Sequence, residues 1–401
     1  MRARTVIAAC AAIVLTLGLP VPARALEQAP EAQAKSFAGD RITGPNWEIK
    51  PQVARDGFSR VFTLKTPYGE FEVVGQRRLD DRLNELRALD ALEKMSKSEM
   101  FVKALAKAGL APLRFGRDLI TNPIETTENL FAGVANVFDR AAAEIDQANA
   151  SKDGTFESLV GVSKARRALA FELGVDAYSD FKPLSRGLDD VAGAVAAGDL
   201  SVRAAFSAIS GGAGTAISGT ATANQLSTPL RDKSSAEIAA QVETDLLAMG
   251  VAGAEIQSFL TSDFYSPADH LAVTAALKTL DAKDPGTFLS RAARARSVDD
   301  AKFQRARVEA MAAHSAKLGT VKAFESVGDY TLARNAKGEL VAVFPFDEII
   351  WTEQVAGSFD KINTAIAAAP QNAKPILGTS AEISTEANAM LTKQGWQIVK
   401  F

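Results

Sequence analysis

The sequence predicts an α+β fold that is predominantly α-helical, with a helical middle flanked by short β-rich N- and C-terminal parts. Alanine is abundant and aromatic residues make up only 7% of the chain, a composition that favours closely packed helices. Leucines recur at three-to-four spacing across residues 79–92, as on one face of a helix. Near both ends, short β-branched and aromatic runs alternate with turn residues, which is typical of strands.

The start of the chain has the three parts of a secretory signal peptide. Arg2 and Arg4 form a basic start, an uncharged apolar stretch covers residues 5–20, and small residues stand at Ala23 and Ala25. We expect cleavage after Ala25 and a mature protein in the bacterial periplasm or cell exterior. An uncleaved membrane anchor is disfavoured, because the apolar run is shorter than the about 20 residues that a spanning helix needs.

The only cysteine, Cys10, lies inside this apolar stretch. A lipoprotein signal would place its cysteine after the apolar core, so we interpret Cys10 as a small apolar residue of the signal. Its removal leaves a cysteine-free mature chain. That excludes disulfides, thiolate catalysis and cysteine-ligated metal sites.

Composition restricts the classes of partner. The formal net charge is −3, so no overall field would attract nucleic acid, and we expect none as a partner. No later apolar run is long enough to predict a transmembrane helix in the mature chain. A hydrophobic content of 47% is ordinary for a globular protein, and the length allows two domains or one large one.

The N-terminal part is expected to contain a tail and a small sheet. Residues 26–44 are polar and are interpreted as a flexible N-terminus. Residues 45–75 are expected to form a β meander, because glycine-containing turns separate its apolar runs. These runs cover residues 47–49, 61–64 and 71–74.

Residues 76–319 are expected to be helical. Gly174, Gly250 and Gly319 are typical of C-terminal helix caps, while Ser266 and Ser297 are typical of helix starts. Further amphipathic segments are predicted at 79–92, 101–109 and 123–145. No fixed repeat period is present, so a regular solenoid is not supported.

Residues 320–401 are expected to form a C-terminal α/β part. A hairpin turn is predicted at 335–338. Strands are predicted at 321–327, 330–333, 340–344, 374–378 and 396–401, and helices at 349–366 and 380–393. Because short strands need partners, we hypothesise that the N-terminal meander and these strands form one sheet. Whether the helical middle is an independent domain stays open.

Acid–base catalysis or metal binding by histidine has little support in the sequence. Only His270 and His314 are present, the first in the opening turn of a predicted helix and the second near the end of another. No metal-binding histidine spacing occurs, so we predict packed or surface histidines, no metal site and no cofactor.

Three short motifs are each better explained by local structure. The segment Gly378–Glu382 resembles a nucleophile elbow, but no histidine follows it, so we expect Thr379 or Ser380 to cap a helix. Residues 149–157 resemble a calcium loop, but Val160 stands where a bidentate carboxylate is needed. Glu157-Ser158 is similar to the glutamate-serine start of lytic transglycosylases, but the next conserved segment of those enzymes is replaced by residues 162–165.

The most unusual segment is 204–230, which contains no charged residue. It is predicted to be a closely packed segment or a loop, and alternatively a segment for ligand, partner or membrane contact. Its candidate interaction residues are Gly211, Gly212, Gly214 and Gly219.

A local basic region precedes the C-terminal part, and a solvated helix face is its default interpretation, with phosphate headgroup contact as the alternative. Its members are Arg291, Arg294, Arg296, Lys302, Arg305 and Arg307.

These observations predict an exported, non-catalytic scaffold or partner-binding module of the bacterial envelope. Its partners would be envelope proteins or the cell wall, and its oligomeric state is not determined by the sequence. One alternative is a periplasmic carboxylate-dependent hydrolase of cell-wall glycans, since two carboxylates can cleave glycosidic bonds. A second alternative is a small-ligand carrier with an apolar pocket.

Overall fold

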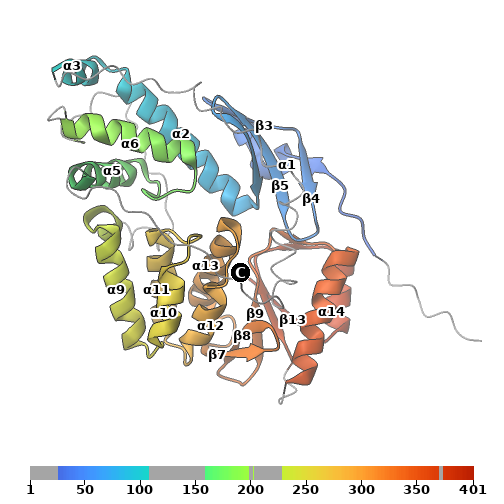
Figure 1. Cartoon of the computed structure of the whole chain (residues 1–401). Helices are drawn as coiled ribbons and strands as arrows, with labels where there is room; N and C mark the ends of the chain where they lie inside the picture. The colour runs from blue at the N-terminus through green and yellow to red at the C-terminus, as the bar shows by residue number, and fades with distance from the viewer. Residues whose placement is uncertain (1–25, 108–158, 198–201, 203–227, 370–373) are drawn as a thin grey trace, which may run out of the picture.

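The computed structural model describes residues 26–107, 159–197, 202, 228–369 and 374–401, and it confirms a mostly helical α+β fold (Figure 1). We call residues 26–107 and 159–197 the N-terminal half, and residues 228–401 the C-terminal half. Figure 1 shows the N-terminal half at the top of the view and the C-terminal half at the bottom.

The N-terminal strands form one antiparallel sheet in the order β1-β4-β5-β3-β2, with β6 also paired to β5. The strands are β1 (Ala32–Gln33), β2 (Thr43–Gly44), β3 (Trp47–Ile49), β4 (Gln52–Arg55), β5 (Arg60–Thr66) and β6 (Gly69–Val74). The expectation that residues 26–44 are flexible needs correction. This segment carries β1, the helices α1 (Lys35–Ala38) and η1 (Gly39–Ile42), and β2, and it buries Ala34 and Ala38 in the core.

Helices pack on this sheet and complete a first hydrophobic core. They are α2 (Gln76–Ser96), α3 (Glu99–Lys107), α5 (Leu159–Leu173) and α6 (Lys182–Ala197). The predicted helix at 79–92 is confirmed within α2, where Leu79, Leu83 and Leu86 are fully buried. Gly174 adopts a φ of 67° after α5, and Val175 donates to the carbonyl of Ala170, as the predicted C-terminal cap requires.

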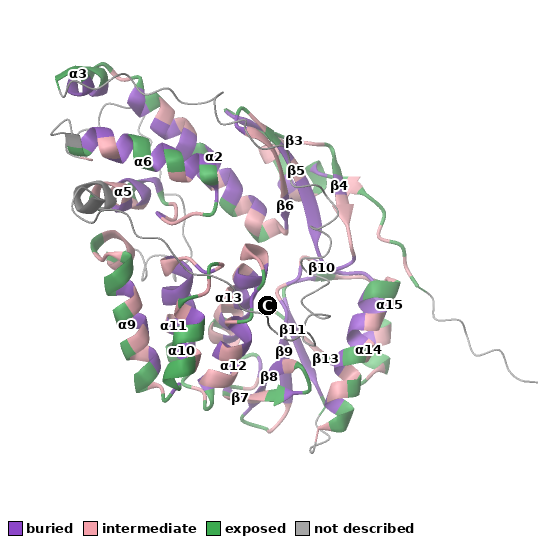
Figure 2. Cartoon of the chain, in the orientation of Figure 1, coloured by how far each residue is buried: buried purple, intermediate pink, exposed green. Residues whose placement is uncertain are grey.

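Five helices of the C-terminal half form much of a second core, together with one face of the C-terminal sheet. They are α9 (Ser235–Ala248), α10 (Gly253–Leu260), α11 (Pro267–Leu280), α12 (Pro285–Ala292) and α13 (Val298–His314). The predicted starts are confirmed, because the hydroxyls of Ser266 and Ser297 accept hydrogen bonds from Asp269 and Asp300. Figure 2 shows exposed residues on the outer side of α9 and buried residues on the strands of the sheet.

The C-terminal sheet has the order β13-β11-β9-β8-β7. Its strands are β7 (Val321–Val327), β8 (Tyr330–Asn335), β9 (Leu340–Val343), β11 (Ile376–Thr379) and β13 (Gln397–Lys400). The strands β9, β11 and β13 are parallel, so each connection between them carries a crossover helix, α14 (Glu353–Ala368) or α15 (Thr385–Lys393). A separate parallel pair joins β10 (Glu348–Ile349) to β12 (Glu382–Ile383).

The hypothesis of a single sheet was wrong, because the N-terminal and C-terminal strands belong to different sheets. The two ends of the chain meet instead through side chains. Phe58, Val61 and Val74 of the N-terminal half share a third core with Trp351 and Phe359. Within the described residues, none of the helices is both long and apolar enough to cross a membrane.

Candidate functional site

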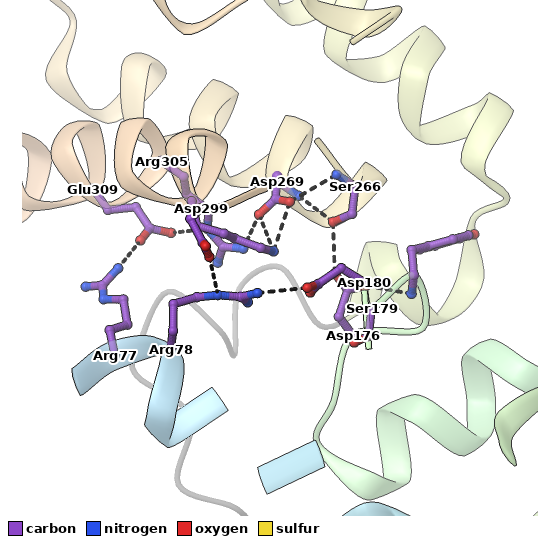
Figure 3. Close-up of polar contacts among 12 residues, drawn as sticks. Arg77, Arg78, Asp176, Ser179, Asp180, Ser266, Asp269, Asp299, Arg305 and Glu309 are labelled. Atoms are coloured by element: carbon purple, nitrogen blue, oxygen red, sulfur yellow. Dashed lines mark hydrogen bonds and ion pairs between the residues drawn. The ribbon is translucent and has the colours of Figure 1, made fainter. Parts of the chain in front are cut away.

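Charged side chains line the contact between the two halves of the molecule, and we call this group the charged seam (Figure 3). It lies between α2 and the turn at 174–181 on one side, and α11 and α13 on the other. Its members are Arg77, Arg78, Arg82, Glu85, Asp176, Asp180, Ser266, Asp269, Asp299, Lys302, Arg305 and Glu309.

Asp269 is the most buried carboxylate of the charged seam, with 1% of its surface exposed. It lies in the first turn of α11, where it accepts from the backbone N–H of Ser266 at 3.0 Å. Lys302 and Arg305 of α13 donate to its oxygens at 2.8 and 2.9 Å. Although burial favours the neutral acid, these two cations hold the pKa of Asp269 well below its usual range.

Arg78 connects the two halves. Its guanidinium donates to Asp180 of the N-terminal half at 2.8 Å and to Asp299 of α13 at 3.3 Å. Arg77 of α2 also reaches α13, where it donates to Glu309 at 3.0 Å. The seam therefore fixes α2 against α13 through charge-assisted hydrogen bonds, which are stronger than neutral ones.

A third crossing contact runs from α11 to the turn, where the hydroxyl of Ser266 donates to Asp176 at 2.9 Å. Behind it, Arg82 donates to Glu85 at 2.7 Å and stacks over the ring of Phe181, and Ser179 donates to Glu85. Burial is the main cause that raises the pKa of Glu85, and Arg82 opposes it.

Asp81 lies beside the charged seam, but its carboxyl is not paired as those of the seam are. Its side chain on α2 is exposed, and within the described residues its carboxyl makes no hydrogen bond or ion pair. Partial loss of hydration raises the pKa of Asp81, and the nearby Arg78, Lys302 and Arg305 oppose that rise.

A second group of charges joins the N-terminal sheet to the C-terminal half, and we call it the joint cluster. Glu348 is 1% exposed and accepts three hydrogen bonds from the guanidinium of Arg55, at 2.9, 3.1 and 2.8 Å. Arg60 donates to Glu348 at 3.2 Å and to Glu382 at 2.6 Å. Planar guanidinium groups suit such multiple pairing to carboxylates.

Asp347 completes the joint cluster without a direct cationic partner. Its two oxygens accept from the backbone N–H groups of Arg60 and Gln76, both at 2.9 Å. Burial is the main cause that raises the pKa of Asp347 to about 6, and Glu348 adds to the effect. Both oxygens are occupied by the backbone, so Asp347 serves the fold.

The histidines have structural surroundings. His270 is buried in the first turn of α11, and its Nε2 lies 3.0 Å from the carbonyl oxygen of Phe259. Burial lowers the pKa of His270. The ring of His314 stacks on Phe401 at 4.2 Å between centroids. Among the residues that the structure describes, no group of three or more histidine or acidic side chains is placed to hold a metal ion.

The segment that resembles a nucleophile elbow is a strand end. Thr379 belongs to β11, and its hydroxyl donates to the carbonyl of Phe344 at 2.8 Å. Helix α15 begins later than predicted, and its cap is Ser384. Neither Thr379 nor Ser380 caps this helix, because β12 intervenes between them and its start.

The predicted solvated basic face was wrong for several of its members. Arg307 is 4% exposed and donates to the carbonyls of Val343 and Thr331 at 3.0 and 2.8 Å. Burial is the main cause that lowers the pKa of Arg307 to about 9. Arg291 is also buried, and Lys302 and Arg305 belong to the charged seam.

Several predicted sites lie outside the described residues. These are the cleavage residues Ala23 and Ala25, the glycines Gly211, Gly212, Gly214 and Gly219, and the loop at 149–157.

A surface hollow of about 400 Å³ lies between the β7–β8 hairpin and the end of α14. Glu325 and Arg334 form part of its wall and are paired to each other at 2.5 Å, while Ala365 and Ala369 form the opposite wall. The two charged side chains of this hollow, Glu325 and Arg334, therefore neutralise each other.

Comparison of the chain with protein-family models, with curated proteins and with solved structures gave no match, so no related protein supplies a function.

Proposed function

We propose that this chain is exported to the bacterial envelope and acts there as a non-catalytic scaffold or partner-binding module. Export is supported by the basic start, the apolar stretch and the small residues at Ala23 and Ala25. The proposal places the mature protein, beginning at Leu26, in the periplasm or cell exterior.

The observation that carries the non-catalytic role is the pairing of the buried carboxylates. Asp269 is held by Lys302 and Arg305, and Glu348 by Arg55 and Arg60. A carboxylate already engaged by fixed donors is unsuited to proton exchange with a substrate, because removing it from its partner leaves a buried charge. The Glu348 group joins the two halves of the molecule, and the Asp269 group joins α11 to α13 within the C-terminal half.

Asp81 gives the hydrolase alternative its one specific support. An exposed carboxyl that no fixed donor engages is free to exchange a proton with a bound glycan, as a general acid must. The substitution Asp81→Asn distinguishes the hydrolase alternative from the proposed non-catalytic binding role. Release of soluble fragments from purified cell-wall glycan by the parent protein, abolished in Asp81→Asn, would favour the hydrolase.

The proposed binding role is tested by affinity purification of the tagged mature protein from its native envelope, with mass spectrometry of what co-purifies. Residues 204–227 are replaced by a serine–glycine segment of equal length, which leaves Leu230 in the second core. Reproducible envelope partners that disappear with this replacement support binding and locate the contact. A clean monomer with no co-purifying component contradicts the proposal.

A further inference from the structure

The first described residues are tied to the C-terminal half by one glutamate. Residues 26–31 form neither helix nor strand, and we call them the N-terminal arm. The backbone N–H of Glu27 donates to the carbonyl of Trp351 at 2.9 Å. The carboxylate of Glu27 accepts from the backbone N–H of Trp351 at 2.7 Å and from the hydroxyl of Ser384.

These contacts hold Glu27 by both its backbone and its side chain. Trp351 is fully buried, and Ser384 is the N-terminal cap of α15, so both partners are fixed by the fold. Leu26, in contrast, has 46% of its surface exposed. The arm is therefore fastened at the second residue after the expected cleavage point, between Ala25 and Leu26.

Proteases bind their substrates as extended segments on both sides of the bond they cut, and a segment that is hydrogen-bonded in the fold must first open. Glu27, the second residue after the expected cleavage point, is hydrogen-bonded to Trp351 and Ser384, so the C-terminal side of the peptidase substrate is engaged in the fold. We propose that the signal peptide is removed before the C-terminal half folds, so that the chain is exported unfolded and Glu27 docks only after cleavage. This inference rests on the proposed export.

The test compares cleavage of three substrates by purified bacterial signal peptidase in detergent. One is a synthetic peptide of residues 1–35, which has no C-terminal half to dock on. The second is the folded full-length precursor. The third is the folded precursor with Ser384→Asp, which leaves the peptidase substrate sequence unchanged. Aspartate preserves the helix cap of α15 but places a like charge against Glu27. Circular dichroism shows that each precursor is folded.

We expect cleavage of the peptide after Ala25, and cleavage of the folded precursor at least about tenfold more slowly, because only the open arm is cut. Ser384→Asp should recover much of the peptide's rate. The control Glu31→Ala changes an exposed carboxylate of the same arm and should behave as the parent.

The outcomes separate the two proposals. An uncleaved peptide contradicts export through this signal. A folded precursor cut as fast as the peptide overturns the order of events while leaving export intact. A resistant precursor whose rate is unchanged by Ser384→Asp shows that Glu27 is not the residue that protects the bond.

Discussion

Asp347 caps helix α2 from the opposite end of the chain. Its carboxylate accepts from the backbone N–H of Gln76 at 2.9 Å, although 271 residues separate the two. The residue at the cap position itself is Gly75, which has no side chain to accept this bond. The first turn of α2 is therefore complete only when the C-terminal half is docked.

Replacement Asp347→Ala should destabilise the protein by about 1–3 kcal/mol, because two buried backbone donors lose their acceptor. Hydrogen exchange should accelerate selectively at the start of α2. Asp329→Ala, at an exposed turn, is the control and should change stability by less than about 0.5 kcal/mol. Unchanged exchange at Gln76 in Asp347→Ala would show that the cap is dispensable. Denaturant titration and exchange mass spectrometry provide both readouts.

The raised pKa of Asp347 predicts a pH dependence with a definite sign. Folding raises its pKa from 3.8 to about 6, so the folded protein binds this proton more tightly than the unfolded chain. Its contribution to stability is largest below pH 3.8 and falls as pH rises to 6. Relative to Asp347→Asn, the parent should lose up to about 3 kcal/mol of unfolding free energy across this range. Parallel stability profiles of the two proteins would contradict the raised pKa.

Asp269 predicts a pH dependence of stability that is opposite in sign to that of Asp347. Its pKa is lowered by Lys302 and Arg305, so its contribution is fully present above pH 3.8 and is lost as pH falls further. Asp269→Asn leaves two cations without their buried anion and should cost about 3–5 kcal/mol at pH 7. Asp245→Asn breaks the exposed pair with Lys278 and should cost at most about 1 kcal/mol. Equal losses in the two variants would argue against the buried network.

The charged seam predicts unequal roles for adjacent arginines. Arg78 is 13% exposed at its side chain and bonds both Asp180 and Asp299, whereas Arg77 is 61% exposed. Arg78→Lys should therefore cost about 1–3 kcal/mol, because one ammonium cannot reproduce the planar fork. Arg77→Lys should cost less than about 1 kcal/mol and should lose its effect in high salt. Urea unfolding at two ionic strengths distinguishes them, and the reverse ranking would exclude Arg78 as the main connection.

Two glycines should respond to alanine in opposite directions. Gly75 has a φ of 94° and a ψ of 146°, a conformation that residues with a Cβ rarely adopt. Gly75→Ala should cost about 1–3 kcal/mol. Gly193 lies inside α6, and a Cβ there would meet nothing within 4 Å. Gly193→Ala should instead raise the unfolding free energy by up to about 1 kcal/mol, because alanine favours helix. Melting temperatures of the two variants test this contrast.

Local signals predicted local structure well. The hydroxyl caps at Ser266 and Ser297, and the glycine cap at Gly174, depend on hydrogen bonds within four or five residues, so the sequence shows them directly. The strands β1 and β2 contain two residues each and exist because of partners elsewhere in the sheet. No periodicity can be read from two residues.

The charged clusters could not be predicted for the same reason. Arg78 and Asp180 are separated by 102 residues, and Arg60 and Asp347 by 287. Charged residues are ordinarily solvated, so no sequence pattern indicated that Arg307 and Glu348 are buried. Only the fold, which brings α2 beside α13 and β5 beside β10, reveals their partners.

The third core sets an order for the assembly of the molecule. Phe58 and Val61 are made early in synthesis, but the aromatic rings that cover them, Trp351 and Phe359, come from the last part of the chain. Contacts of such long sequence separation form slowly, because a long loop must close before they are made. A chain truncated before Trp351 would leave the apolar side chains of the first sheet uncovered, which makes such fragments prone to aggregation and proteolysis.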